Sequence, residues 1–202
     1  MSLFLNYEEN ALKKKLFAGS KGTTENKKMK SILLWVFEIA VVLVLAAVVS
    51  IFFCQSIVMQ EGSMEPTLAT QDKILINKVI YKIKEPQRGD IIAFKNSPED
   101  HASIHIKRVI GLPGEKIQIK DGQILINGKT YMEKKDFPQI SNGGLAEQTI
   151  TLGKDEYFVL GDNRNNSEDS RYGDVGNVKK KYIVGKLWFV ISPRSKFGFL
   201  ES

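Results

Sequence analysis

The chain has 202 residues, 29 Lys+Arg against 23 Asp+Glu, and a pI near 9.2. Its hydrophobic fraction of 43% and charged fraction of 26% are typical of globular proteins, which excludes wholesale disorder and a fibrous repeat. One cysteine excludes an internal disulfide framework, and two histidines leave little room for a histidine-rich metal centre.

The excess positive charge is concentrated at the N-terminus. Residues 1–31 contain seven lysines and three glutamates, which is +4 of the formal +6, whereas the other 171 residues contain 22 basic and 20 acidic ones. The later run 179–181 (KKK) is interpreted as a solvated turn, with contact to lipid headgroups as the alternative. It lacks the interleaved aromatic residues of a nucleic-acid surface, so no nucleic-acid partner is predicted.

A long apolar segment follows this basic tail. Residues 32–54 contain a single charged residue, Glu38, and neither glycine nor proline. About 20 apolar residues cross a bilayer as a helix, and the polar stripe of a soluble helix is missing. A cleaved secretory signal fits less well, because its apolar core has only ~7–15 residues. We predict a transmembrane helix over 32–54, with the tail 1–31 in the cytoplasm and residues 55–202 outside the cell membrane.

Residues 55–202 show the pattern of an antiparallel β domain. The clearest stretch is 116–131, where short alternating runs are joined by Asp-Gly at 121–122 and Asn-Gly at 127–128, dipeptides that suit two-residue hairpin turns. Further strands are expected at 74–80, 90–95, 104–110, 149–152, 157–160 and 182–191. The predicted fold class is mainly β, an antiparallel and barrel-like sheet domain preceded by one transmembrane helix.

Three polar segments of this domain are candidates for chemistry. The first, GSMEPTL, places Ser63 on a turn before a proline, which presents the hydroxyl instead of burying it. The second, IKRVIGLPGE, carries Lys107 and Arg108 on opposite faces of an apolar strand, so that one of them is expected to point inward. The third, GDNRNNSEDSR at 161–171, is a dense polar loop. Taken singly, the first is better explained as a simple turn and the second as an edge strand with solvated charges, and the third is either a solvated loop or a hydrogen-bonded network.

In this order, and behind an N-terminal anchor, the three segments resemble the motifs of the bacterial type I signal peptidases. The segment RGDIIAF at 88–94 resembles a further motif of that family, and the likeness covers the anchor and about residues 55–191. The single span is similar to that of the compact Gram-positive members. The resemblance implies a membrane-bound serine endopeptidase, a signal peptidase I, that cleaves N-terminal signal peptides from exported preproteins.

The resemblance also implies roles for individual residues. Ser63 would be the nucleophile, with its backbone N–H as one oxyanion donor, and Lys107 the general base, since a desolvated neutral lysine can take the serine proton. Ser167 would hydrogen-bond and orient the lysine amine. The structural supports of the site would be Asp162, Arg164, Asp169 and Arg171, the last two as an ion pair. Glu61 stands where some members have a serine that supplies a second oxyanion donor, and a carboxylate is an acceptor only.

Substrate binding is expected beside the same residues. The resemblance implies that an extended peptide pairs with the stretch 59–62 and with the strand around His105, and that shallow pockets take small side chains at −1 and −3 of the cleavage site. The matched substrate-binding residues would be Met59, Glu61, Met64, Leu68, His105 and Ile106. The apolar residues 57–59 are expected to reach the outer leaflet, which makes membrane lipid a second partner.

Neither a cofactor nor a metal is expected. His101 and His105 lie four residues apart, but no cysteine or cluster of carboxylates completes a ligand set. Three alternatives stay open: a catalytically silent relative that assembles surface proteins, a peptidase dedicated to pilin-type substrates, and a tethered β domain that only binds peptides or cell wall. The presence of both Ser63 and Lys107 counts against the first and the third.

Overall fold

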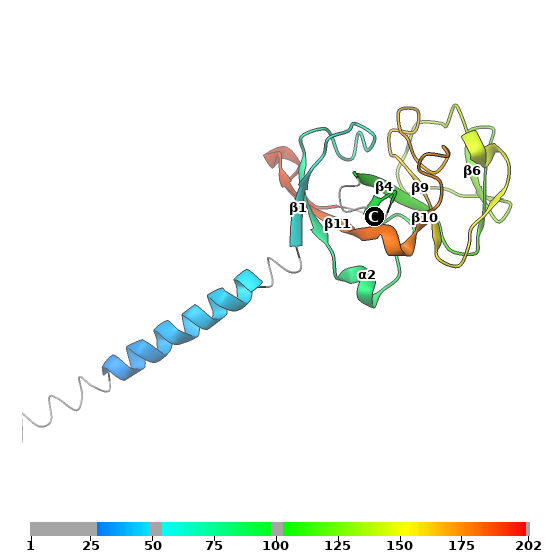
Figure 1. The fold of residues 1–202 in the computed structure, drawn as a ribbon. Coiled ribbons are helices and arrows are strands. Elements are labelled where there is room, and N and C mark those ends of the chain that lie inside the picture. The colour runs from blue at the N-terminus through cyan, green and yellow to red at the C-terminus, as the bar shows by residue number, and fades with distance from the viewer. Residues whose placement is uncertain (1–27, 49–53, 98–102, 201–202) are drawn as a thin grey trace, which may run out of the picture. The chain divides into compact units, whose positions relative to one another are not determined.

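The computed structural model describes residues 28–48, 54–97 and 103–200 (Figure 1). The chain divides into two compact units, residues 1–50 and 51–202. The basic tail before Lys28 and the histidine at position 101 lie outside the described residues.

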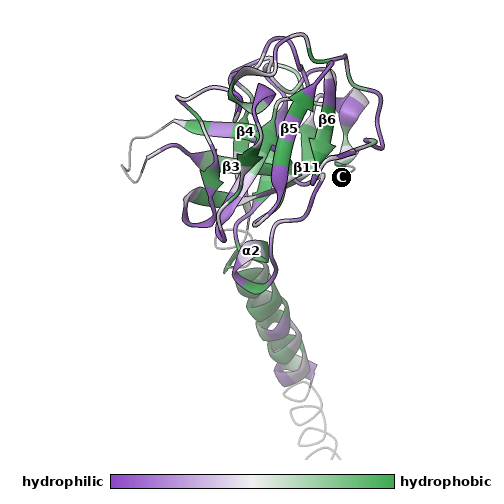
Figure 2. Ribbon diagram, turned by 90° about the vertical axis from the view of Figure 1, so that its right-hand side faces the viewer, coloured by the Kyte–Doolittle hydropathy of each residue, from purple (hydrophilic) through white to green (hydrophobic). Residues whose placement is uncertain are grey.

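The first unit contains one long helix, Lys28–Val48, of 21 residues. Its length and composition are sufficient to cross a membrane, and Figure 2 shows apolar residues along nearly its whole length. Large apolar side chains such as Leu34 and Phe37 are 62% and 66% exposed, as expected for a helix covered by lipid instead of protein. The helix begins before the predicted span, and Cys54, predicted to end that span, begins the first β-strand instead.

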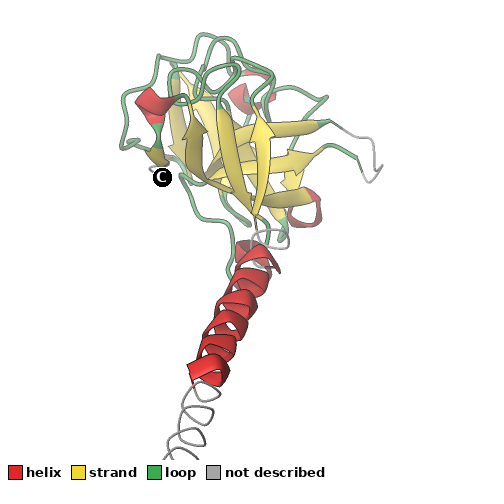
Figure 3. Ribbon diagram, turned by 90° about the vertical axis from the view of Figure 1, so that its left-hand side faces the viewer, coloured by secondary structure: helices red, strands yellow, loops and turns green. Residues whose placement is uncertain are grey.

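The second unit is built mostly of β-strands and loops (Figure 3). Its strands are β1 (Cys54–Val58), β2 (Lys73–Asn77), β3 (Ile91–Lys95), β4 (Ile104–Gly111), β5 (Lys116–Lys120), β6 (Gln123–Ile126), β7 (Lys129–Thr130), β8 (Ile150–Thr151), β9 (Glu156–Leu160), β10 (Val178–Lys179), β11 (Ile183–Ser192) and β12 (Gly198–Phe199). Its helical turns are α2 (Ile80–Ile83), η1 (Gly144–Glu147), η2 (Lys180–Tyr182) and η3 (Arg194–Lys196). The predicted mainly-β class is confirmed, while β1, β10 and β12 had no clear sequence signal.

One predicted strand is shorter than expected. The run 74–80 stays in β2 only as far as Asn77, whose Oδ1 accepts the N–H groups of Val79 and Ile80 at 3.0 Å each. A side-chain acceptor of this kind satisfies the free N–H groups at the start of a helical turn, so the chain turns into α2 instead of extending the strand.

The strands form two antiparallel sheets. The larger has the order β1-β2-β11-β3-β4-β9-β10, with β12 beside β11, and the smaller has the order β7-β6-β5-β8. Strand β11 is ten residues long, and its register shifts against both β2 and β3, as bulged strands do when they bend. Strand β4, which carries Lys107, lies between β3 and β9 in the interior of the larger sheet.

Two tight hairpins join β5, β6 and β7, as predicted. The backbone φ angles are 53° at Asp121 and 74° at Gly122, and 52° at Asn127 and 78° at Gly128. Positive φ at both central residues defines the turn whose twist matches that of the flanking strands. The three strands β5, β6 and β7 of the smaller sheet therefore follow from these two dipeptides, whereas β8 joins β5 from a distant part of the chain.

Apolar side chains cover both faces of the central strands. Strand β3 is buried along Ile91–Phe94 and β4 along Ile106–Gly111. Neighbouring residues of a strand point to opposite faces, yet Lys107 is 0% exposed and Arg108 only 4%. The expectation that one of these two cations points inward is confirmed by Lys107, and Arg108 is buried as well, because neither face of β4 is open to solvent.

Candidate active site

Ser63 lies in a tight turn that connects β1 and β2. The Glu65 N–H donates to the Gly62 carbonyl at 3.2 Å. The Leu68 N–H donates to the Met64 carbonyl at 2.9 Å, and both of these side chains are fully buried in the core. Burial of Met64 and Leu68 in the core therefore holds the turn in place. Ser63 is only 6% exposed, because its hydroxyl is presented to another side chain and not to open solvent.

That side chain is Lys107 of β4. Its backbone lies opposite Ile92 of β3, and its Nζ donates a hydrogen bond to Ser63 Oγ at 2.8 Å. Burial lowers the pKa of Lys107 below its ordinary value, because apolar surroundings disfavour the ammonium form, although the charges of Glu61 and Asp169 act in the opposite direction. A larger fraction of this lysine is therefore neutral at a given pH than for a lysine in water.

Glu61 places a carboxylate beside this lysine. Its Oε2 lies 3.7 Å from Lys107 Nζ, and the Glu61 side chain is 62% exposed. The contact is long for an ion pair and remains hydrated, so it is weak. Even so, the negative charge of Glu61 raises the pKa of Lys107 and opposes the effect of burial.

A buried ion pair joins the loop after β9 to β4. The Asp162 carboxylate accepts hydrogen bonds from Arg108 Nε at 2.8 Å and from Arg108 Nη2 at 2.7 Å. Arg108 also donates to the Gly89 carbonyl at 2.7 Å. The resemblance assigned Asp162 to the site but gave Arg108 no role; the available signal was an arginine directly after the lysine in an apolar strand.

A second buried ion pair closes the same loop, as expected. Arg171 Nε and Nη2 donate to the Asp169 carboxylate at 2.8 and 2.9 Å. Asp169 Oδ2 also accepts the Gly161 N–H at 3.0 Å, and Arg171 reaches the Asn142 carbonyl at 3.0 Å. The pair therefore connects the beginning and the end of the loop.

Arg164 contacts a carboxylate that the sequence did not indicate. Its guanidinium forms a bidentate ion pair with the Glu133 carboxylate, with Nη2 2.6 Å from Oε1. The same guanidinium lies over the ring of Phe137, 4.3 Å from the ring centroid. Its Nε donates to the Gly161 carbonyl at 3.1 Å. Glu133 stands in a charged run of the sequence, where nothing distinguishes it from a solvated glutamate.

Ser167 does not make the hydrogen bond that the resemblance implied. Its Oγ is buried without a hydrogen-bond partner among the described residues, while Lys107 Nζ bonds to Ser63 Oγ. The loop still brings Ser167 to the site. A Cβ placed on Gly161 would lie 2.2 Å from Ser167 Oγ and 2.5 Å from the Ser63 carbonyl oxygen, so only glycine allows this close approach.

The expected substrate-binding residues occupy two kinds of position. Four of them share one core cluster and are at most 6% exposed: Met59, Met64, Leu68 and Ile106. Their side chains are packed together in the core close to Ser63 in the sequence or the sheet, and their packing leaves them almost no exposed surface. His105 is half-buried, with its ring centroid 5.7 Å from that of Phe94, and burial and the charge of Lys107 lower its pKa.

An open hollow of about 600 Å³ adjoins Ser63. Its lining residues are Glu61, Gly62, Ser63, Asn165, Asn166, Ser167, Glu168, Tyr172 and Asp174. Over residues 28–48, 54–97 and 103–200, no three His, Cys, Asp or Glu side chains are grouped to hold a metal ion. A serine hydroxyl bonded to a buried lysine, beside an open hollow, is an arrangement suited to nucleophilic attack on a peptide carbonyl.

The family model described as signal peptidase, peptidase S26, matches residues 32–192, a range that contains Ser63, Lys107 and the loop after β9. The chain belongs to the signal peptidase family. Membership confirms the predicted class of enzyme, a serine peptidase that hydrolyses preproteins at their signal peptides, and a catalytically silent assembly role is not favoured. Membership and the apolar helix together associate this signal peptidase with a membrane.

Several relatives of this signal peptidase share about a third of its residues. Signal peptidase I S of Bacillus subtilis (strain 168) is 37% identical over 174 residues, 82% of this chain and 92% of the relative. Signal peptidase I P of Bacillus subtilis subsp. natto is 35% identical over 176 residues, 84% and 94% of the two chains. Signal peptidase IB of Staphylococcus aureus (strain COL) is 33% identical over 188 residues, 83% and 93%. The crystal structure of a signal peptidase I from Enterococcus faecalis V583 is 37% identical, with a TM-score of 0.42, and covers 52% of this chain and 98% of its own.

Proposed function

We propose that this signal peptidase cleaves preproteins with Ser63 as the nucleophile and Lys107 as the general base. The observation that carries the proposal is the 2.8 Å hydrogen bond between Lys107 Nζ and Ser63 Oγ, made by a fully buried lysine. A serine hydroxyl is a weak nucleophile until a neighbouring base removes its proton, and a lysine with a lowered pKa is able to do so.

The proposed reaction proceeds in two stages. Neutral Lys107 takes the proton from Ser63 Oγ while this oxygen attacks the scissile carbonyl carbon, and the Ser63 N–H stabilises the resulting oxyanion. The lysine ammonium gives the proton to the leaving amine of the mature protein as the C–N bond breaks. Water then loses a proton to Lys107 and attacks the acyl–serine ester; the signal peptide leaves and the proton returns to Ser63 Oγ.

The loop after β9 acts as the positioning element of this proposal. The Asn163 N–H donates to the Ser63 carbonyl at 3.1 Å, and Asn163 Nδ2 donates to the Gly62 carbonyl at 3.2 Å. The preceding residue, Asp162, binds Arg108, which follows the lysine in β4. The loop thus ties the turn of the nucleophile to the strand of the base, and Asn163 joins the residues expected to support the site.

We further propose that the apolar helix crosses the membrane once, with the N-terminus in the cytoplasm and the catalytic unit outside. The lysines that precede the helix support this orientation. In this topology the site meets an exported preprotein where its apolar signal core is still held in the bilayer. Membrane lipid would contact exposed apolar residues near the start of the unit, such as Val58.

A synthetic preprotein with alanine at −1 and −3 tests the proposed function. The detergent-solubilised full chain is expected to cleave it directly after −1. Leucine at −1 is expected to lower kcat/KM by about 100-fold, because Met64 and Leu68, the proposed pocket residues, are fully buried in the core and the proposed pocket above them is shallow. Mass spectrometry of both fragments measures the rate and the position.

The same preprotein with leucine at −5 is the matched control and keeps its rate. Equal cleavage of the −1 leucine substrate would contradict the proposed pocket but leave the activity standing. A failure to cleave the alanine substrate would contradict the proposed function itself.

Glu61→Gln is expected to move the acidic limb of the pH–rate profile to lower pH. The base works only when it is neutral, and the charge of Glu61 raises the pKa of Lys107. Removing that charge lowers the pKa, so the neutral form persists to lower pH. The measurement is kcat/KM against pH, with Glu147→Gln, an exposed glutamate on η1, as the control. A limb that stays in place or moves to higher pH rules out this electrostatic role.

A further inference from the structure

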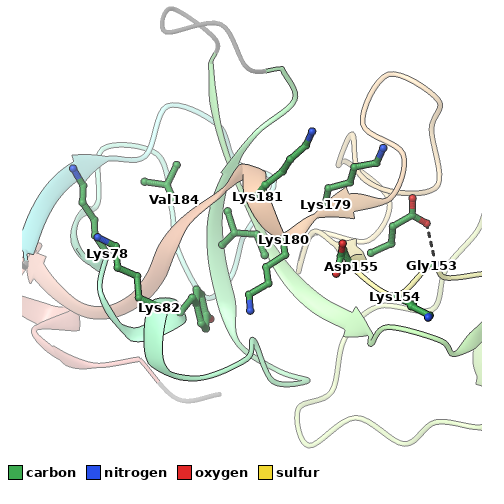
Figure 4. A pocket seen from close by; sticks show the side chains of 12 residues that line it. Lys78, Lys82, Gly153, Lys154, Asp155, Lys179, Lys180, Lys181 and Val184 are labelled. Carbon is green, nitrogen blue, oxygen red and sulfur yellow. Dashed lines mark hydrogen bonds between the residues drawn. The ribbon is translucent and has the colours of Figure 1, made fainter.

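A second hollow, which shares no lining residue with the one at Ser63, is rich in lysine. Its volume is about 880 Å³. Its lining residues are Lys78, Tyr81, Lys82, Gly153, Lys154, Asp155, Glu156, Lys179, Lys180, Lys181, Ile183 and Val184. We call it the lysine hollow. Figure 4 shows that its lysines come from three separate segments: the chain around α2, the turn between β8 and β9, and the chain from β10 into β11.

The lysine hollow carries surplus positive charge. Of its six lysines, Lys180 alone forms an ion pair within the described residues, and its partner is Glu85. Of its two carboxylates, that of Glu156 accepts hydrogen bonds from the Gly153 N–H at 3.1 Å and from Asn177 Nδ2 at 3.2 Å. Among the lining residues, these other five lysines stand against the two carboxylates of Asp155 and Glu156, a surplus of three positive charges that attracts anions.

The fold holds the walls of this hollow in place. The Tyr81 hydroxyl donates to Asp90 Oδ2 at 2.9 Å, which fixes its ring, and the Lys180 N–H donates to the Asp155 carbonyl at 2.8 Å. The apolar part of the lining is half-buried and consists of Tyr81, Ile183 and Val184. The hollow thus offers cations together with a fixed apolar surface.

Strand pairing connects one rim of the hollow to the start of the catalytic unit. Cys54, the first residue of β1, pairs with Asn77, and Lys78 follows Asn77 directly. Only residues 49–53 separate Cys54 from the helix that ends at Val48, and an extended chain of that length covers about 20 Å. In the proposed topology, the strand that pairs with this rim therefore begins only five residues along the chain from the membrane-spanning helix.

We infer that the lysine hollow binds the phosphate groups of anionic phospholipids in the membrane that anchors the chain, an inference that rests on the proposed topology. Lysine ammonium groups are compact charges that bind phosphate, and each lysine near an anionic surface strengthens binding by about five-fold. Free phosphate would need only the cations. The apolar lining favours a ligand with hydrocarbon next to its phosphate, which is the chemistry of a lipid.

The test measures lysine acetylation of the full chain in vesicles, residue by residue, by mass spectrometry. Adding phosphatidylglycerol to phosphatidylcholine vesicles is expected to slow acetylation at least about three-fold at the unpaired lysines of the hollow. These are Lys78, Lys82, Lys154, Lys179 and Lys181. Exposed lysines of the smaller sheet are the control and should keep their rates: Lys116, Lys120 and Lys129.

Variants sharpen this test. The triple change Lys82→Gln, Lys179→Gln and Lys181→Gln is expected to abolish most of the protection of Lys78 and Lys154. A matched triple glutamine variant of the three control lysines is expected to leave it intact.

Each other outcome overturns the inference. Equal protection by inorganic phosphate with phosphatidylcholine vesicles indicates a general anion site. Equal slowing at the control lysines indicates non-specific attraction, and unchanged rates indicate a solvated surface. Preprotein cleavage in the same vesicles reports on the proposed function independently, so cleavage without selective protection rejects the lysine hollow alone.

Discussion

Lys107→Met is expected to lower kcat for preprotein cleavage by about 10⁴-fold while KM changes little. Methionine is similar in length and suits a buried apolar position, but it has no basic nitrogen. The Ser63 hydroxyl then keeps its proton, and the leaving amine receives none. Single-turnover cleavage of the alanine preprotein by the detergent-solubilised chain measures the loss, and circular dichroism verifies that the fold is retained.

Ser63→Ala is expected to cause a loss of the same size, and the double variant no further loss, because nucleophile and base act as one unit. Lys120→Met, on the exposed side of β5, is the matched control and should retain full activity. Either active-site variant with more than about a tenth of the wild-type rate would be incompatible with the dyad, since general-base catalysis alone contributes at least about 10²-fold.

Asp162→Ala is expected to destabilise the catalytic unit by about 3–5 kcal/mol. The change leaves the Arg108 guanidinium buried without its carboxylate, and an uncompensated buried charge is far more costly than a lost surface ion pair. The loop after β9 should become more mobile at the same time. Activity is therefore expected to fall at urea concentrations too low to unfold the catalytic unit. Urea-induced unfolding in mild detergent, followed by circular dichroism, measures the free energy of unfolding.

Two further variants separate charge from packing in this experiment. Arg108→Met combined with Asp162→Leu removes both charges and is expected to recover most of the stability. Lys180→Ala breaks the exposed pair with Glu85 and should cost less than about 1 kcal/mol. If Asp162→Ala and Lys180→Ala lowered the free energy of unfolding by similar amounts, the buried ion pair would contribute no more to stability than the exposed one.

Lys107 and Arg108 illustrate where sequence information ends and tertiary structure takes over. Their position in an apolar strand was visible in the sequence, and alternation predicted that one of them points inward, without indicating which one or that the other is buried too. Both are buried because β4 lies inside a sheet that is covered on both faces, and this cover comes from residues distant in the chain. The partner of Arg108, Asp162, is 54 residues away, a separation at which no local pattern pairs two side chains.

Ser167 and Glu133 show the same limit. The motif led us to expect a bond from Ser167 to Lys107, whereas the Ser167 hydroxyl is packed closely against Gly161 and has no hydrogen-bond partner among the described residues. Glu133 was indistinguishable from a solvated glutamate until Arg164 was found beside it.

The lysines show what both kinds of information contribute. Their number and their concentration in the tail are properties of the sequence, and so is the interpretation of the tail as a topology signal instead of a nucleic-acid surface. The run 179–181 was interpreted as a solvated turn with lipid contact as the alternative. The gathering of six lysines from three segments around one hollow is a property of the fold alone.

The sequence by itself determined the apolar helix, the β class, the two hairpins and the identity of the family motifs. Each of these depends on a few consecutive residues: hydropathy over about 20 positions, or positive φ at two. Only the tertiary structure decided that Lys107 Nζ meets Ser63 Oγ across 44 residues, and that Arg108 is buried with it. Such contacts depend on strand order and register, which arise from the packing of the whole unit.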